Sequence, residues 1–465
     1  MATTSLSCSI RQAQRRRSWR GYAASAFIIL QTFALEAAST PNERVAKNIQ
    51  DAEGNSATTS RSASAVSDKG AQVNVKAYGA VGDGVTNDTA AFNKALAVCA
   101  VGGGTCLVPE GKYLISASGI STAPHRPSVL SGVHLIGSGQ ASILKIAGMP
   151  TDHFLPCEGD NWSVENLTFD MGDYTSAGLA AISCKGNNWR VANCAINKSG
   201  KWAIIAFGGK NWAIERNHVT RTVPGARPPI GAILVTKQGD VWSSHGRVIG
   251  NVCEGAGITF AGANGVIASN RISRSGYGSG IFVQGSPSTR SATITGNICS
   301  EGSSGYDDSQ AGKWWSVNGF EVWAPDSIIC NNIAHDNDGG GFAIGGPNSI
   351  VIGNKAYNNG RGHHGYAGFN ARINVAKGTS ASHSIFIANS SHDQDFGYKE
   401  QAAGISDIKQ IGNDYNRNRI GPAKSFGAGG QMPISAEMKA KLKALAEDPD
   451  VPDSARRAVH AWLAK

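Results

Sequence analysis

The stretch "VIASNRISRSGYGSGIFVQGSPSTRSATITGNIC", residues 266–299, contains one unit of the repeat that decides the fold. It opens with apolar residues followed shortly by Asn270, and the same motif returns at Asn297. Between them lies a second motif, Gly-(Ile/Phe)-x-apolar, here "GIFVQ". Short apolar runs with no long helix between them predict strands of three to five residues.

The unit recurs along most of the chain. The asparagines of the first motif are Asn166, Asn193, Asn217, Asn251, Asn270, Asn297, Asn332, Asn354 and Asn389, spaced about 28 residues apart on average. The second motif returns as "GITFA", "GFEVW" and "GFAIG". Self-similarity on this scale predicts a solenoid, and its short strands predict an all-β, single-stranded parallel β-helix. The alternative, a β-sandwich with Asn-rich turns, fits the near-constant unit length less well.

Stacked coils bury a continuous apolar column, and Asn at one corner of each coil predicts a ladder of amides bonded between coils. Cys253 and Cys299 both lie two residues after the Asn, so we expect them to fill the column as small apolar residues. Cys99 and Cys106 flank "AVGGGT" and either bridge or stay reduced. No Cys/His group has zinc-finger spacing.

Residues 1–37 have the pattern of a secretory signal peptide. Five arginines precede the apolar run "GYAASAFIILQTFAL", and a small residue ends a plausible cleavage site at Ala37. An uncleaved membrane anchor is the alternative, and the shortness of the run disfavours it. Removing five Arg and one Glu lowers the formal charge from +9 to +5. We expect a secreted or periplasmic protein with no membrane attachment after signal removal.

The mature chain divides into three parts. Residues 38–72, rich in Ser, Ala and Thr, predict a flexible linker. Residues 73–425 form the β-helix, whose first coil is capped by a helix near 88–100 that begins at Asn87 or Asp88. Residues 426–465 predict two short helices separated at residues 448–452, which cap the stack or pack against its coils.

The composition narrows the function classes. With 58 glycines and 17% charged residues, the chain is not a helical bundle or coiled coil. Mild basicity without a phosphate-cradling loop does not indicate nucleic acid as a partner, although it is compatible with anionic polymers. We expect a monomer.

The opening segment "VNVKAYGAVGDGVTNDTAAFNKALAVCAVGGGTCLVPEGKYLI", residues 73–115, resembles the entry segment of the pectate-lyase-like, polygalacturonase-related superfamily. With the repeats, the resemblance covers roughly residues 73–420. It implies a right-handed parallel β-helix that binds or cleaves carbohydrate polymers in an open groove. It does not fix the reaction, because the superfamily includes hydrolases, lyases, epimerases and phage-type depolymerases. The sequence motifs typical of polygalacturonases are matched only in part, at Asp307-Asp308, at "GHHG" 362–365 and at Arg372–Asn374.

Period two along the Gly-(Ile/Phe)-x-apolar strands predicts which side chains face outward. One outward file comprises Thr259, Phe282, Glu321, Ala343 and Asn370. The file beside it comprises Ala261, Gln284, Trp323, Gly345 and Arg372. Insertions rich in acids, aromatics and histidines precede these strands and are expected over the same face.

This face carries the candidate site. The candidate catalytic acids are Glu321, Asp307, Asp308, Asp336 and Asp338. The candidate substrate-binding residues are Tyr306, Lys313, Trp314, Trp315, Trp323, Gln284, His363, His364 and Arg372. Glu321 is flanked by apolar residues and indoles, which disfavour its charge and suit a general acid. The tryptophans and Tyr306 offer apolar planes for stacking on sugars.

Three functions follow from these residues. The first is a glycoside hydrolase, in which one carboxyl donates a proton while another attacks or activates water. The second is a polysaccharide lyase acting on a uronate polymer, with Ca²⁺ held by the aspartates and a Lys, Arg, His or Tyr removing the C5 proton. The third is a non-catalytic polysaccharide-binding surface protein or adhesin. The hydrolase reading requires no cofactor.

Overall fold

The computed structural model describes residues 70–116, 129–148, 153–172, 180–198, 202–221, 231–276, 278–286, 288–303, 317–361, 366–374, 379–401, 405–424, 436–449, 451 and 453–464. The predicted signal peptide lies outside these residues. The predicted linker does too, except at its end, because the first strand begins at Ala71 and not at residue 73.

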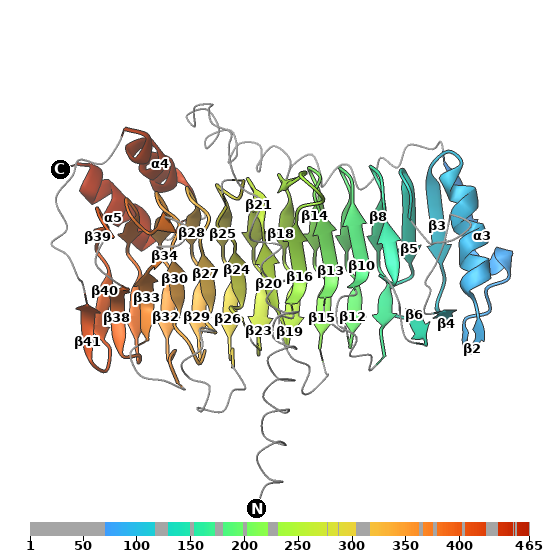
Figure 1. The fold of residues 1–465 in the computed structure, drawn as a ribbon, viewed down its shortest axis with the longest axis horizontal. Coiled ribbons are helices and arrows are strands. Elements are labelled where there is room, and N and C mark those ends of the chain that lie inside the picture. Colours follow the sequence, from blue (N-terminus) through green and yellow to red (C-terminus); the bar gives the residue numbers. More distant parts are fainter. Residues whose placement is uncertain are drawn as a thin grey trace, which may run out of the picture. The chain divides into compact units, whose positions relative to one another are not determined.

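The described chain winds through three parallel sheets, to which successive coils contribute one strand each (Figure 1). Sheet 1 comprises β1 (Ala71–Asn74), β3 (Gly104–Val108), β5 (Val133–Gly137), β8 (Ser163–Glu165), β11 (Arg190–Ala192), β14 (Ala213–Glu215), β18 (Arg247–Ile249), β22 (Val266–Ala268), β25 (Thr293–Thr295), β28 (Ile328–Cys330), β31 (Ile350–Ile352), β36 (Ile385–Ile387) and β39 (Lys409–Ile411).

Sheet 2 follows sheet 1 in each coil. It comprises β2 (Asp83–Asn87), β4 (Gly111–Ser116), β6 (Ser142–Ala147), β9 (Thr168–Asp170), β12 (Ala195–Asn197), β15 (His218–Thr220), β19 (Val252–Glu254), β23 (Arg271–Ser273), β26 (Ile298–Ser300), β29 (Ile333–His335), β32 (Lys355–Tyr357), β37 (Ser390–His392) and β40 (Asp414–Arg417).

Sheet 3 completes the coil. It comprises β7 (Leu155–Cys157), β10 (Ala180–Lys185), β13 (Trp202–Phe207), β16 (Gly231–Thr236), β20 (Gly257–Phe260), β24 (Ile281–Val283), β27 (Phe320–Val322), β30 (Phe342–Ile344), β33 (Ala367–Ala371), β38 (Phe396–Glu400) and β41 (Gly421–Lys424). Two small sheets pair β17 (Ser243–Ser244) with β21 (Gly262–Ala263) and β34 (Ile373–Asn374) with β35 (Thr379–Ser380). The predicted parallel β-helix is confirmed.

The capping helix α3 (Thr89–Ala100) follows the predicted pattern (Figure 1). Its buried face consists of Ala91, Phe92, Ala95, Leu96 and Cys99, as the apolar spacing predicts. Asp88 is the N-cap residue, but its carboxylate accepts from the backbone N–H groups of Val81 and Gly82 and not from the helix. The cap is therefore joined to the turn before β2, where Gly82 adopts a positive φ of 74°.

An asparagine ladder runs through the corner between sheets 1 and 2. Side-chain amides donate to the next carbonyl oxygen at 2.9 to 3.0 Å from Asn217 through Asn251, Asn270, Asn297, Asn332, Asn354 and Asn389 to Asn413. The prediction was wrong for Asn166 and Asn193. They adopt a left-handed φ of 56° and 53°, one residue before the ladder position, which Leu167 and Cys194 occupy.

The first coils are joined by aromatic stacking instead. Trp162, Trp189 and Trp212 stack in parallel inside the solenoid, with ring centroids 5.0 and 5.2 Å apart. Further along, Phe320, Phe342 and Phe369 stack at 4.7 and 4.9 Å. In-register strands bring identical positions together at about 4.8 Å, which is the spacing that parallel rings require.

The eight described cysteines are all buried and free. Cys99 and Cys106 are joined by a thiol–thiol hydrogen bond, so of the two alternatives the structure shows the reduced pair. Cys253 and Cys299 lie wholly inside the column, as expected for apolar filling. Burial raises the pKa of the Cys253 thiol to about 12, which keeps it protonated and unreactive.

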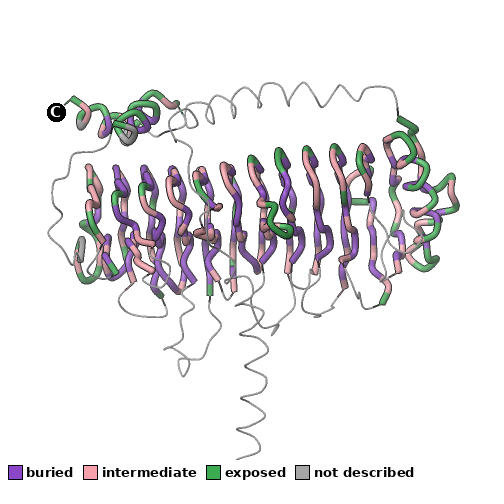
Figure 2. The backbone as a smooth tube through the Cα atoms, turned by 45° about the horizontal axis from the view of Figure 1, so that its top comes forward, coloured by how far each residue is buried: buried purple, intermediate pink, exposed green. Residues whose placement is uncertain are grey.

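The two predicted tail helices are α4 (Ala436–Glu447) and α5 (Asp453–Leu463). Leu442, Leu445 and Val459 pack against Ile350 and Ile387 of sheet 1. The tail therefore covers an apolar part of the outer surface of sheet 1, as the coil-packing alternative predicts. Figure 2 shows buried residues along the stacked strands and exposed residues over the capping helix and the tail.

Candidate functional site on sheet 3

The register of sheet 3 places the predicted outward files as the sequence pattern indicates. Thr259, Phe282, Glu321, Ala343 and Asn370 are paired in succession from β20 to β33. Their inward neighbours, from Ile258 through Phe320 to Phe369, are fully buried. Glu321 thus lies on the outer wall of the β-helix and not inside it.

Glu321 sits among hydrogen-bond donors. Its Oε1 accepts from Trp323 Nε1 at 2.8 Å and from Arg372 Nη1 at 3.4 Å. Its Oε2 accepts from Ser279 Oγ at 2.9 Å and from Asn318 Nδ2 at 3.5 Å. Of these four groups only the Ser279 hydroxyl can also accept, so the arrangement suits an ionised carboxylate.

Trp323 and Arg372 share the file beside Glu321, with Gly345 between them. A Cβ at Gly345 would lie 2.1 Å from Trp323 Cε3, so the indole lies across this glycine. Arg372 is two coils from Glu321, and its side chain spans the coil whose outward residues are Ala343 and Gly345. The two charged side chains are only 18% and 16% exposed, which strengthens their attraction.

Tyr366 connects this pair to Asp338. Tyr366 immediately precedes β33, and its Cδ1 lies 3.9 Å from the position of a Cβ on Gly340. Burial raises the pKa of the Tyr366 hydroxyl, while the nearby Arg372 guanidinium lowers it and the Asp338 carboxylate raises it. Asp338 also lies 3.9 Å from Arg361 Nη2. Asp338 and Arg372 thus both act on the Tyr366 hydroxyl, and the catalytic role of Asp338 stays a prediction.

Asp336 faces a different surface. It adopts a left-handed φ of 57° and bonds to His335 Nδ1 at 2.6 Å and to Asn358 on the outside of sheet 2. His335 stacks on Tyr357, which stacks on His392, with centroids 4.8 and 5.2 Å apart. Burial raises the pKa of the Asp336 carboxyl, but hydrogen bonds and the nearby cations outweigh it and lower the pKa. The hydrogen bonds of Asp336 are to His335 and Asn358 at the end of sheet 2, and Arg361, which lies 3.9 Å from Asp338, is a nearby cation.

The other candidates divide into two groups. Gln284 lies outward on sheet 3, in the file of Trp323, at the end of β24. Tyr306, Asp307, Asp308, Lys313, Trp314, Trp315, His363 and His364 lie outside the described residues. Their assignments stay predictions.

Three site residues were missed by sequence reasoning. Ser279 and Asn318 each precede the glycine that begins an outward motif, so the alignment of the strands contained a signal for both. Tyr366 lies directly before "AGFNA". In the two preceding coils, Gly339 and Val317 occupy the equivalent position.

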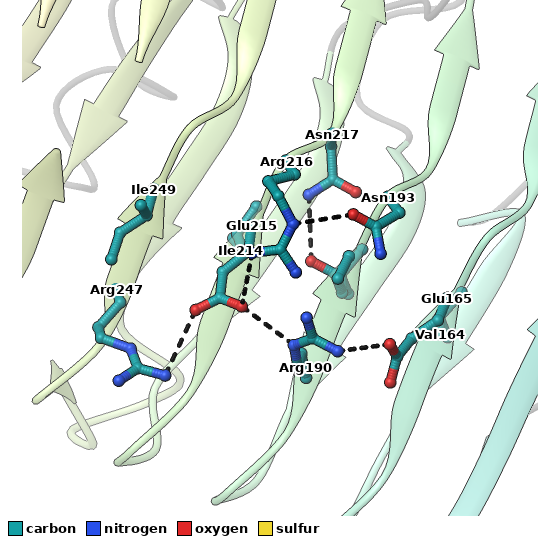
Figure 3. A network of polar contacts seen from close by, with 12 residues as sticks. Val164, Glu165, Arg190, Asn193, Ile214, Glu215, Arg216, Asn217, Arg247 and Ile249 are labelled. Atoms are coloured by element: carbon teal, nitrogen blue, oxygen red, sulfur yellow. Dashed lines mark hydrogen bonds and ion pairs between the residues drawn. The ribbon is translucent and has the colours of Figure 1, made fainter. Parts of the chain in front are cut away.

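A second charged network lies on sheet 1, away from this face (Figure 3). Arg190 bonds to Glu165 and to Glu215, and Arg247 bonds to Glu215 at 3.3 Å. The partners alternate between adjacent strands, so acid and base meet diagonally across the sheet. Arg216 also pairs with Glu215 at 3.8 Å, so three arginines share two carboxylates in a network that joins neighbouring strands.

Within the described ranges, no three His, Cys, Asp or Glu side chains converge as a metal site would require. The Ca²⁺ site expected for a lyase includes Asp307 and Asp308, which lie outside the described residues, so it stays a prediction. None of the described helices is both long and apolar enough to cross a bilayer.

Residues 72–156 match the family model "Rhamnogalacturonase A/epimerase, pectate lyase-like". Mannuronan C5-epimerase AlgE1 of Azotobacter vinelandii is 36% identical over 107 residues, which cover 23% of this chain and 8% of the epimerase. AlgE4 of the same organism is 36% identical over 115 residues, covering 23% of this chain and 20% of the epimerase. The aligned part is thus a small fraction of these relatives' length.

Solved structures resemble the chain over a longer range. The A-module of AlgE4 superposes with a TM-score of 0.62 at 18% identity, covering 78% of this chain and 100% of the module. The surface adhesin PfbA of Streptococcus pneumoniae gives 0.55 at 16% identity, covering 73% and 88%. At such identities the likeness concerns the fold. The chain is a parallel β-helix protein, and its residues 72–156 match the rhamnogalacturonase A/epimerase, pectate lyase-like model.

Proposed function

We propose that this protein acts outside the cytoplasm on an acidic polysaccharide and catalyses proton transfer at C5 of a uronate residue. The observation that supports this most directly is the grouping of Arg372, Tyr366 and Glu321 on the outer face of sheet 3. The segment shared with the mannuronan C5-epimerases and the predicted signal peptide favour the same substrate class and location.

Arg372 supplies the charge that the reaction needs. Removing a proton next to a carboxylate places further negative charge on that carboxylate, which is the slow part of the chemistry. A guanidinium can hold both carboxylate oxygens through parallel N–H groups. Glu321 accepts from Nη1 of Arg372 and holds the guanidinium on this face, so it acts as a positioning residue.

Tyr366 supplies a proton. Because burial keeps its pKa above that of an ordinary tyrosine, the hydroxyl is protonated at neutral pH. It can return a proton to C5, which inverts the sugar, or protonate the leaving oxygen at C4, which cleaves the chain. We assign removal of the C5 proton to His363 or His364, which precede Tyr366 by three and two residues in the sequence.

Glycoside hydrolysis is the second candidate. It is favoured by the carboxylates of Glu321 and Asp338, which come from consecutive coils of one face. In this case the Glu321 carboxylate attacks the anomeric carbon or activates water, and Asp338 donates the proton. Stacked coils about 4.8 Å apart are compatible with the carboxylate separation that such enzymes use.

The test is incubation of the purified chain with polymannuronate, polygalacturonate and a neutral glucan. Ultraviolet absorbance of an unsaturated product indicates elimination, and a changed sugar configuration by NMR indicates epimerisation. Reducing ends without absorbance indicate hydrolysis. Tyr366→Phe is expected to lower C5 chemistry by about 10²- to 10⁴-fold.

Tyr357→Phe is the matched control, because Tyr357 is half-buried on sheet 2. Unchanged proton transfer in Tyr366→Phe would contradict the proposal. Hydrolysis that is lost in Glu321→Gln but retained in Tyr366→Phe would establish the second candidate. The absence of any product, together with retained polymer binding, would identify a binding protein.

A further inference from the structure

We propose that Cys99 and Cys106 are joined by a disulfide in the exported protein, and that this bridge locks the capping helix α3 onto the first coil. The bridge is independent of the proposed function, because it lies in the capping segment and not on the outer face of sheet 3. It rests on the contact between the two thiols and on the way in which the two ends of α3 are held.

The two thiols meet inside the capped end of the solenoid. Cys99 lies in the last turn of α3, on its buried face, and Cys106 lies on the inward side of β3 (Figure 1). Neither side chain is exposed to solvent, and the Cys106 thiol donates a hydrogen bond to the Cys99 sulfur. A disulfide requires Cβ atoms roughly 3.5–4.5 Å apart, and two thiols in hydrogen-bond contact come near this geometry.

Other cysteines of the described chain are arranged differently. Cys253 and Cys299 are separated by the strand of Ile272, so their strands are about 9.6 Å apart, beyond the roughly 7 Å that a disulfide allows between Cα atoms. Cys157 and Cys184 are partners in adjacent parallel strands, which are about 4.8 Å apart, wider than the Cβ separation of a disulfide. The capping pair differs, because a helix that packs on a strand brings its side chains together.

The helix α3 is held unequally at its two ends. The carboxylate of Asp88 ties the N-terminal end to the turn before β2. At the C-terminal end, the backbone N–H of Val101 bonds to Val98 O at 3.3 Å, and three glycines follow at 102–104. Glycine gives the unfolded chain the most conformational freedom. A bridge across these glycines therefore lowers the entropy of the unfolded chain and fixes the second end of the cap.

Formation of the bridge is a two-electron oxidation, and its oxidant is a second disulfide. The hydrogen bond from Cys106 lowers the pKa of the Cys99 thiol, although burial opposes this effect, so Cys99 is the thiolate that attacks. It bonds to one sulfur of the oxidant and displaces the other as a thiolate. Cys106 gives its proton to that thiolate, attacks the Cys99 sulfur and displaces the remaining sulfur of the oxidant. The two thiols of the chain become one disulfide, and the disulfide of the oxidant becomes two thiols.

Export supplies an oxidant of this class. The predicted signal peptide directs the chain to a compartment in which disulfides form and persist. Because both sulfurs are fully buried in the folded chain, the exchange takes place before α3 settles on the first coil. Once the helix has packed, reductants do not reach the two sulfurs. The bridge is therefore a structural crosslink and not a redox switch.

Refolding of the purified full chain from urea, in a mixture of reduced and oxidised glutathione, tests the bridge. Trypsin cleaves after Lys94 and Lys112, so both cysteines fall in the peptide 95–112. In the refolded chain, unfolded again for alkylation, this peptide is expected to resist the reagent until a reductant is added. The oxidised chain is also expected to melt about 3 °C above the same chain kept in dithiothreitol.

Cys99→Ala and Cys253→Ala form a matched pair, because each change removes one fully buried sulfur. Oxidation is expected to lower the number of free thiols by two in the wild type and in Cys253→Ala, and to leave it unchanged in Cys99→Ala. Alkylation of the peptide 95–112 at both cysteines in the oxidised wild type would overturn the bridge. An equal loss of thiols in Cys99→Ala and Cys253→Ala would overturn it as well.

Discussion

Replacing Asn297 by Ala tests how far the asparagine ladder holds the coils together. Its Oδ1 accepts from the backbone N–H and from Nδ2 of Asn270, both at 2.9 Å. Its Nδ2 donates to Asn332 Oδ1 at 2.9 Å, to Ile267 O at 2.8 Å and to Thr295 O at 3.1 Å. The side chain is fully buried, so water cannot replace these bonds.

The partners of Asn297 differ in how much free energy each loses in the Ala variant, because some keep a second hydrogen bond and one does not. Asn270 Nδ2 still donates to Val248 O, and Asn332 Oδ1 still accepts from the backbone N–H of Asn297. The backbone N–H of Asn270, in contrast, loses its hydrogen-bond acceptor and is left unsatisfied in the interior. With one orphaned donor and several weakened bonds, we expect the free energy of unfolding to fall by about 3–4 kcal/mol.

The measurement is equilibrium unfolding in urea followed by tryptophan fluorescence. Asn193→Gly is the matched control, because Asn193 is exposed and a glycine keeps its positive φ; its effect should be within about 0.5 kcal/mol. The double variant Asn270→Ala/Asn297→Ala should cost less than the sum of the single changes, since the side-chain bond between Asn270 and Asn297 is lost in both. Equal stability of Asn297→Ala and Asn193→Gly would refute the ladder's role.

Three further predictions concern the site and its surroundings. Trp323→Phe removes the indole N–H bond to Glu321 and should lower kcat/KM by about 10- to 100-fold without a matching loss of stability, because bonds to charged groups contribute about 1.5–3 kcal/mol; steady-state rates and urea unfolding check both parts. Gly345→Ala places a methyl group within the Trp323 ring and should reduce turnover, whereas Gly278→Ala, with no atom of the described residues within 4 Å of the new Cβ, should not. Asp336 has a pKa below its ordinary value of 3.8, so its contribution to stability is present above pH 3.8 and is lost as the pH falls through the lowered pKa; Asp336→Asn should flatten the fall in stability in that range, measured by acid unfolding.

Local patterns predicted what local chemistry determines. The buried face of α3 and the outward files of sheet 3 followed from helical spacing and period two, because each depends on adjacent residues. The ladder was misplaced at Asn166 and Asn193 because Asn also favours the left-handed turn one residue earlier. A motif centred on Asn cannot tell these two positions apart.

The candidate site was harder to predict because its contacts join different coils. Ser279 and Glu321 are 42 residues apart, and the insertion between them determines nothing about their distance. Asp336 and Asp338 seemed equivalent in the sequence. The left-handed φ of Asp336 brings its carboxylate to His335 and Asn358, while Asp338 acts on Tyr366. Arg361 is near both acids. The surroundings of Asp336 and Asp338 differ because of how the coils stack. The sequence encodes this stacking register only through the lengths of the loops.

The early coils are joined by stacked tryptophans and the later coils by asparagine hydrogen bonds. This difference affects which coils can be duplicated when the chain lengthens. A duplicated segment that starts at Asn251 and ends before Asn270 would bring its own amide, so both joins would regain a donor and an acceptor. A duplicate taken from around Leu167 or Cys194 would bring no such amide, and its indole would have to find neighbouring rings. The later coils are therefore interchangeable modules, whereas the earlier ones are tied to their place in the order.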